Sequence, residues 1–172
     1  LIVPLSLSMT LPPFISQNFG AEKVHRVKEA YLTTMKFVMV WQALVFLIMW
    51  LSGAFIAQAF AQDAEVERLI ILFLSIVPLG YGLQGIVILT NSSLNAMHKP
   101  MGALVLSILR FFAFFIPVSY VGSLMFDLHG IFWGGVVAYL LMGIISFTWF
   151  SRLMNGALNQ VNQKDVALQE GA

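Results

Sequence analysis

The stretch Leu69–Leu89, LIILFLSIVPLGYGLQGIVIL, decides the fold of this chain because it contains no charged side chain. At about 1.5 Å of rise per residue, a helix of roughly 20 residues spans a hydrocarbon layer about 30 Å thick. The stretch also lacks the polar face that a surface helix of a soluble protein would present to water. It therefore predicts a helix that crosses a lipid bilayer.

Three other stretches share this property. They are Phe37–Phe60, Ala103–Phe126 and Ile131–Phe150, and Arg110 is the only charged residue in all four stretches. Over the 172 residues, hydrophobic residues make up 59% and charged residues 10%, whereas soluble proteins contain about 45–50% and about 25%. The chain is therefore expected to be an all-α, polytopic membrane protein.

Composition and motifs exclude several function classes. The absence of cysteine excludes disulfides, thiolate metal sites and cysteine nucleophiles. No zinc-protease, serine-hydrolase or phosphate-loop motif occurs. His25, His98 and His129 lie in predicted connections on two sides of the membrane, so a shared metal site is not expected. The basic residues are scattered and the net charge is +1, which indicates no nucleic-acid partner. Neither an enzyme nor a bound cofactor is predicted.

The two ends of the chain differ. Leu1–Ile15 is apolar but short, Pro12 and Pro13 interrupt it, and no signal-peptide pattern precedes it. We interpret it as the second half of a helix that begins upstream, and we expect the chain to be a C-terminal part of a larger membrane protein. The predicted spans lie near residues 1–16, 31–60, 69–96, 102–126 and 130–154, and a polar C-terminal tail covers residues 155–172.

Basic residues in the connections predict the orientation, because Lys and Arg accumulate on the cytoplasmic side. One side carries six of them: Lys23, Arg26, Lys28, Lys99, Arg152 and Lys164. The other side carries only Arg68. The first and third connections and the C-terminus are therefore expected to be cytoplasmic. The connections predicted at 98–102 and 127–130 are so short that they join antiparallel neighbours.

Polar side chains recur along one face of the predicted span 69–96. Tyr81, Gln84, Asn91 and Asn95 follow one another at offsets of 3, 7 and 4 residues, so they share a helix face. An unpaired amide in hydrocarbon is costly, so this face must meet another helix or a water-filled cavity. Two interpretations stay open: hydrogen bonds between helices, and a substrate cavity lined by these side chains.

Arg110, prolines and glycines are the other unusual residues within the spans. Arg110 can extend towards the lipid head groups, pair inside the bundle, or contact substrate. Pro78 and Pro117 each remove a backbone donor and are expected to kink their helices, which favours a protein with moving parts. Gly130 and Gly134 have the spacing that permits close packing of helices.

Two groups of residues resemble motifs of the multidrug and toxic compound extrusion (MATE) transporters. The run Ile15–Ala21, ISQNFGA, followed by Arg26, is similar to a QNFGA-type motif in a cytoplasmic loop of that family. A second group resembles the penultimate helix of the family: Lys99, Pro100, Arg110 and Pro117. Both groups occur in the expected order, at compatible spacing and with agreeing orientation.

The resemblance implies a fold and a function. The fold is most of the C-terminal lobe of a twelve-helix protein, from the end of the eighth helix to the twelfth, in which two six-helix lobes flank a cavity. The function is secondary active transport that exports drugs or organic cations, often aromatic, in exchange for H⁺ or Na⁺. The resemblance also implies a location in the bacterial cytoplasmic membrane. The partners would be the lipid bilayer and the preceding part of the same protein.

The resemblance also implies roles for individual residues. A cytoplasmic loop that helps one lobe to rock would contain Gln17, Asn18, Gly20, Ala21 and Arg26. The tenth helix, which faces the cavity, would contain Tyr81, Gln84 and Asn91. Gating or structural roles are expected for Pro78, Lys99, Pro100, Arg110 and Pro117. Some family members carry an acid in the tenth helix and this chain has none there, so we expect the ion-coupling carboxylate to lie outside this chain.

Two other functions remain as alternatives. A lipid-linked oligosaccharide flippase of the same superfamily would need a larger and more basic cavity than a neutral stripe of amides and phenol indicates. A membrane scaffold subunit without transport activity would show packing faces of small residues and no polar stripe. The polar stripe therefore favours the transporter over both.

Overall fold

The computed structural model describes the backbone of residues 1–170 and all of their side chains except those of residue 165 and residues 168–170. The elements in chain order are α1 (Ile2–Gly20), α2 (Val24–Phe60), α3 (Ala64–Ala96), α4 (Pro100–Ile108), the π-helix η1 (Leu109–Phe115) and α5 (Ile116–Glu170). This described part of the chain contains no strand, and the predicted all-α bundle is confirmed.

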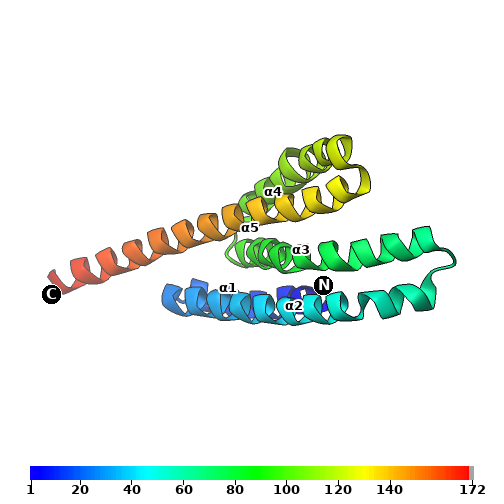
Figure 1. Cartoon of the computed structure of the whole chain (residues 1–172). Coiled ribbons are helices and arrows are strands. Elements are labelled where there is room, and N and C mark those ends of the chain that lie inside the picture. Colours follow the sequence, from blue (N-terminus) through cyan, green and yellow to red (C-terminus); the bar gives the residue numbers. More distant parts are fainter. Residues whose placement is uncertain (171–172) are drawn as a thin grey trace.

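The helix α3, which contains the deciding stretch Leu69–Leu89, is the centre of the bundle. It contacts α1, α2, α4 and α5. Figure 1 shows α1 and α2 along one side of α3, with α4 and α5 on the other side, and it shows the C-terminal part of α5 extending beyond the other helices. A helix with neighbours on both sides needs apolar residues all round, and this is the pattern of its sequence.

The helix α5 turns back on itself at Phe126 and Asp127. Phe126 has φ −141° and ψ 22°, and Asp127 has φ 50° and ψ −131°, so neither residue is helical. The two arms, 116–125 and 128–170, run antiparallel (Figure 1). The turn is shorter than the predicted connection at 127–130, since residues 128–130 already belong to the second arm.

Glycines allow this tight turn. Gly122 and Gly130 face each other across the hairpin, and a Cβ on either one would collide with the backbone of the other. A Cβ on Gly134 would lie 2.9 Å from the carbonyl oxygen of Val118, which is also too close. The predicted role of Gly130 and Gly134 in close helix packing is therefore confirmed.

The other connections are also shorter than predicted and contain residues 21–23, 61–63 and 97–99. The helix α3 begins at Ala64 because Asp63 Oδ1 accepts a hydrogen bond from the Val66 N–H at 2.8 Å, which caps the first turn. Glu65 and Glu67 follow in that turn, where the helix dipole favours acidic side chains. The sequence predicts a connection before residue 69 that includes these charged residues, because charge alone does not distinguish a loop from a helix terminus.

Proline does not interrupt the first helix. Pro12 and Pro13 lie inside α1, which is continuous from Ile2 to Gly20, so the expected interruption is wrong. The φ angle of proline fits a helix, and the ring removes hydrogen bonds rather than the helical path. Leu11 and Ile15, on either side of the prolines, are buried. Their burial fixes this part of α1 against the neighbouring helices.

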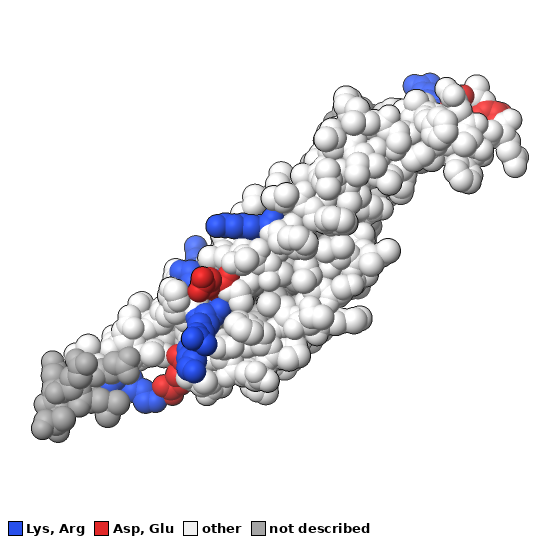
Figure 2. Space-filling model, turned by 90° about the horizontal axis from the view of Figure 1, so that it is seen from below, with Lys and Arg blue, Asp and Glu red and all other residues white. Residues whose placement is uncertain are grey.

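Charged and apolar surfaces occupy separate zones of the molecule. Figure 2 shows a few charged side chains at one tip of the molecule and a band of them across it nearer the other end, with a broad uncharged surface between the two groups. Three described segments are long and apolar enough to cross a membrane: α2, α3 and Pro100–Lys164. The last segment contains the turn of α5 and so offers two passes. Large apolar side chains on α2, including Val40, Leu51 and Phe55, are exposed, which suits contact with lipid.

The buried core centres on Tyr31 of α2, which is 0% exposed. Its ring stacks on Phe150 of α5 with a centroid distance of 3.7 Å. Its hydroxyl lies 2.7 Å from Thr90 Oγ1 of α3. Thr90 donates its own proton to the carbonyl oxygen of Ile86 at 2.8 Å, so Tyr31 is the donor in the pair. One side chain therefore joins three helices.

We predict that replacing Tyr31 by Phe lowers the free energy of unfolding by about 0.6–1 kcal/mol, because only the interhelical hydrogen bond is lost. Replacing Tyr31 by Ala should lower it by about 3–5 kcal/mol, because the stacking contact is lost as well. The measurement is thermal unfolding of the purified protein in detergent. Tyr120→Phe is the matched control, since Tyr120 is 64% exposed; equal effects of Tyr31→Phe and Tyr120→Phe would contradict the assigned bond.

Candidate substrate-binding site

An aromatic pocket of about 260 Å³ lies between α3, η1 and α5. Five of the side chains that line it are aromatic: Phe73, Tyr81, Phe115, Phe132 and Tyr139. Phe73 meets Phe132 edge to face, and Phe115 meets Tyr139 at a tilt, each pair with a centroid distance of 5.7 Å. Walls of this kind suit a flat aromatic ring, which can stack on them or meet them edge-on.

A glycine brings one wall of the aromatic pocket close to α3. A Cβ on Gly80 would lie 3.3 Å from Cδ2 of Tyr139 and 3.6 Å from Cγ2 of Val136. The Tyr139 ring therefore rests against α3 because residue 80 has no side chain. The pocket volume is below the roughly 300–1,000 Å³ of sites that enclose a drug-sized ligand, so the pocket has room for one ring system of a larger molecule.

Arg110 supplies a positive charge on η1, the short helix that also contributes Phe115 to the aromatic pocket, although Arg110 itself does not line the pocket. Its Cζ lies 4.3 Å from the centroid of the Phe111 ring, a cation–π contact. Its Nε is buried and has no hydrogen-bond partner among the described residues. A buried donor without a partner is unfavourable by about 1–3 kcal/mol, so the position favours a ligand that can accept a hydrogen bond.

The π-helix η1 sets the position of Arg110. At its end, the Ile116 N–H donates to the carbonyl of Phe111, five residues back instead of four. Pro117 follows directly and has no N–H for an α-helical bond. The wider turns before Pro117 rotate Arg110 and Phe115 away from the directions that an α-helix would give them. Short π-helical segments occur frequently at functional sites.

The structure divides the predicted polar stripe among different neighbours. Tyr81 lines the aromatic pocket. Gln84 is half-buried and does not line it, and Asn95 is exposed. Asn91 Nδ2 donates to Ser107 Oγ of α4 at 3.0 Å. For Asn91 this contact favours the first interpretation, a hydrogen bond between helices. One helix face meets different partners along its length, because ten residues correspond to about 15 Å of rise.

Four of the five motif residues expected in a cytoplasmic loop are helical instead, and only Ala21 lies in the connection 21–23. Gln17, Asn18 and Gly20 belong to the last turn of α1, Ala21 is its C-cap, and Arg26 belongs to the first turn of α2. The helix end is closed by backbone bonds from Ala21 to Gln17 and from residue 23 to Asn18. The motif therefore forms a tight junction between two helices, and the expectation of a loop is wrong for every motif residue except Ala21.

The remaining candidates occupy structural positions. Lys99 is the N-cap of α4 and Pro100 is its first residue, where a missing N–H leaves no bond unmade. Pro78 is buried inside α3 and does not end that helix. Pro117 begins the straight part of α5 after η1. None of these four side chains lines the aromatic pocket.

Four aromatic residues of the pocket escaped the sequence analysis: Phe73, Phe115, Phe132 and Tyr139. These residues are apolar or aromatic and resemble ordinary lipid-facing or core positions in the sequence, whereas polar side chains within an apolar stretch are conspicuous. Phe73 and Tyr81 are eight residues apart, which places them on one face of α3 and offers a weak signal. The sequence contains no signal that α3, η1 and α5 bring these side chains together. Within the described residues, no three His, Cys, Asp or Glu side chains are close enough to hold a metal ion.

Membrane-length antiparallel helices, an aromatic pocket between them and a half-buried cation are features of a polytopic membrane protein of the transporter class. The MatE family model matches residues 1–121, and the chain belongs to this family. Its members are transporters and not enzymes. The recognition of a MATE protein from the sequence is thus confirmed.

Similar proteins come from several bacteria. A protein of Shewanella oneidensis named FAD transporter is 34% identical over 153 residues, which cover 89% of this chain and 34% of that protein. The crystal structure of the Vibrio cholerae MATE transporter VcmN in the bent form matches with a TM-score of 0.85 and 28% identity, covering 90% of this chain and 35% of that one.

An outward-facing multidrug resistance MATE family transporter also matches, with a TM-score of 0.83. Its identity is 18%, so it shows the shared fold alone; the match covers 91% of this chain and 36% of that one. The chain thus spans about a third of the length of the relatives it matches.

We predict that Asn91→Ala changes stability only slightly, by about 0.6 kcal/mol, the average for a hydrogen bond between membrane helices. The physical reason is that Asn91 bonds Ser107 and does not line the aromatic pocket. The measurement is a double-mutant cycle with Ser107→Ala by thermal unfolding in detergent. Additive losses in the double variant would show that the two side chains are not coupled.

Proposed function

We propose that this chain forms part of a secondary transporter that exports a planar aromatic anion of the FAD type, and that the aromatic pocket holds one ring system of this substrate. The proposal rests on the aromatic pocket together with Arg110 of the adjoining η1, whose buried Nε lacks a hydrogen-bond partner among the described residues. The name of the relative from Shewanella oneidensis supports the same substrate.

Charge favours an anion over a cation. The four apolar stretches contain Arg110 and no carboxylate. In a medium of low dielectric constant, an unpaired guanidinium attracts a phosphate strongly and repels an ammonium group. FAD combines a flat tricyclic ring with a pyrophosphate, so one molecule supplies both an aromatic surface and an acceptor for Arg110. The pocket volume of about 260 Å³ suits the ring system rather than the whole dinucleotide.

Export of cationic aromatic drugs is the second candidate, because the ring faces of Tyr81 and Tyr139 can also attract a cation. Family membership and the similarity to VcmN are compatible with it. In both cases we propose exchange against H⁺ or Na⁺. No acidic residue lies in the four apolar stretches, and an ion-coupling carboxylate has to be desolvated or caged, so the proposed coupling site lies outside this chain.

The test of the substrate is transport of FAD by the intact protein in proteoliposomes. We expect Arg110→Gln to lower FAD transport by about tenfold or more, the effect of a lost charge-assisted hydrogen bond. Uncharged riboflavin should be affected less, because it lacks the pyrophosphate. Tyr139→Ala should lower transport of both flavins, because it opens one wall of the aromatic pocket.

The matched control for Tyr139→Ala is Tyr120→Ala, an exposed tyrosine on the same helix that does not line the pocket. Ethidium serves as the cationic comparison substrate. Transport of ethidium without transport of FAD would overturn the anionic substrate and favour drug export. Equal loss for FAD and riboflavin in Arg110→Gln would show that Arg110 acts on folding or gating rather than on the phosphate.

We also propose that the end of the molecule with residues 21–23, residues 97–99 and the C-terminus faces the cytoplasm. The ion pair of Lys164 with Glu22 at 2.7 Å supports one common side for the first connection and the C-terminal arm. The chain has no native cysteine, so single cysteines give a clean test. A cysteine replacing Glu65 should react with a membrane-impermeant thiol reagent outside intact cells, and one replacing His25 should not. The reverse pattern would discard this orientation.

A further inference from the structure

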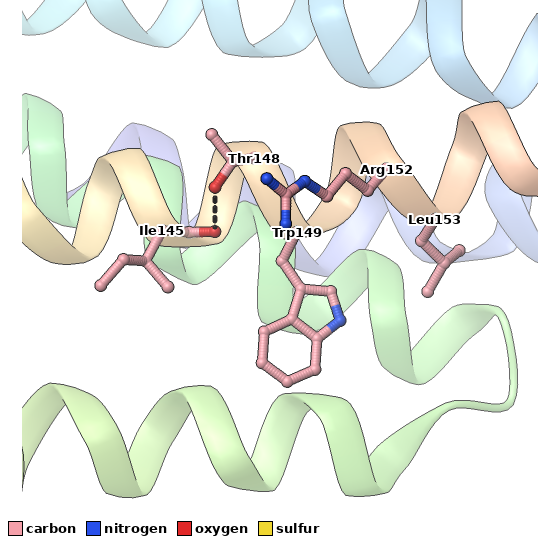
Figure 3. A pocket seen from close by; sticks show the side chains of 5 residues that line it. All are labelled: Ile145, Thr148, Trp149, Arg152 and Leu153. Carbon is pink, nitrogen blue, oxygen red and sulfur yellow. Dashed lines mark hydrogen bonds between the residues drawn. The ribbon is translucent and has the colours of Figure 1, made fainter.

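A second groove, distinct from the aromatic pocket, lies on the second arm of α5. Its volume is about 520 Å³, and it is lined by Ile145, Thr148, Trp149, Arg152 and Leu153. All five residues come from neighbouring turns of one helix, as Figure 3 shows. The groove therefore combines one cation and one indole with two aliphatic side chains.

The two N–H-bearing side chains of this groove have no partner within the described part of the chain. Arg152 is exposed and takes part in no hydrogen bond or ion pair there. The indole N–H of Trp149 donates no hydrogen bond there either. Thr148 already donates its proton to the carbonyl oxygens of Ile144 and Ile145, at 2.8 and 3.0 Å. The groove therefore offers donors and positive charge, which suit a ligand that only accepts hydrogen bonds.

The Arg152 side chain lies back along α5, as helical side chains generally do. Figure 3 shows its guanidinium turned back along α5 towards the turn of Thr148, which is the direction of the apolar part of the helix. Arg152 lies only two residues, or about 3 Å of rise, beyond Phe150, the last residue of the stretch Ile131–Phe150. The Arg152 guanidinium therefore lies near the end of the apolar stretch Ile131–Phe150.

The neighbourhood favours an anion at this level. Lys28 of α2 reaches the same region, where its Nζ donates to Asn155 Oδ1 at 2.9 Å, one turn after Arg152. Tryptophan is enriched at the boundary between hydrocarbon and head groups. Ile145 and Leu153 provide apolar surface beside the charge. Basic groups beside apolar surface at a membrane boundary are the features that recognise lipid head groups.

We propose that this groove binds an anionic phospholipid, with the phosphate on Arg152 and the Trp149 N–H and with the acyl chains along Ile145 and Leu153. A guanidinium holds a phosphate through two parallel hydrogen bonds, and the indole adds a third donor. The site is independent of the aromatic pocket and of the identity of the transported substrate.

The test measures lipid binding to the intact detergent-purified protein by native mass spectrometry and thermal unfolding. Phosphatidylglycerol should raise the melting temperature of the wild type by about 2 °C or more, and phosphatidylcholine, whose choline offsets the phosphate charge, should raise it less. Arg152→Gln should weaken phosphatidylglycerol binding about tenfold. Arg152→Lys should give an intermediate value, because it keeps the charge and loses the two-point geometry. Trp149→Phe should weaken binding by a smaller factor.

Lys23→Gln is the matched control, since Lys23 is exposed at the same end of the molecule and should bind lipid as the wild type does. Equal lipid binding by Arg152→Gln and the wild type would overturn the site. Equal stabilisation by inorganic phosphate would assign the groove to a free anion instead of a lipid. A melting temperature lowered equally with and without lipid in Arg152→Gln would show a contact with protein, and would also overturn the proposal.

Discussion

The contact of Tyr31 with Thr90 and Phe150 holds the helices in register. In a bilayer the lipid chains are as apolar as the side chains, so burial alone gives helices little reason to prefer one another over lipid. A stacked ring and a directed hydrogen bond do give such a preference, because both require one arrangement of the partners. The helices α2, α3 and α5 meet at this side chain, and the most deeply buried residues lie around it.

Small residues make the close approach of these helices possible. Gly85 of α3 faces Val38 of α2, where a Cβ would lie only 2.8 Å from Cγ1 of Val38. Gly122 and Gly130 have the same effect inside the α5 hairpin. Close backbones increase dispersion contacts along the whole interface, so these glycines help to determine which faces pack together and which remain exposed to lipid.

The positions of two arginines follow from this framework. Arg110 is half-buried on η1, which also contributes Phe115 to the aromatic pocket, whereas Arg152 is exposed on α5 just after an apolar stretch ends. Both guanidinium groups lack an acidic partner among the described residues. In a chain with no acid in its apolar stretches, positive charge can recognise anionic partners, a substrate inside and a lipid outside.

The sequence alone determined the membrane class, the all-α fold, the family and the packing role of Gly130 and Gly134. These four conclusions follow from local features of the sequence: the length of the uncharged stretches, the order of the family-like motifs, and the spacing of the small residues. Only the tertiary structure decided which polar residues line the aromatic pocket. Asn91 bonds Ser107 of another helix, whereas Tyr81 joins Phe115 and Tyr139 in the aromatic pocket. A helical face is periodic in the sequence, but its neighbour at each level depends on how separate helices pack, and no local pattern records that packing.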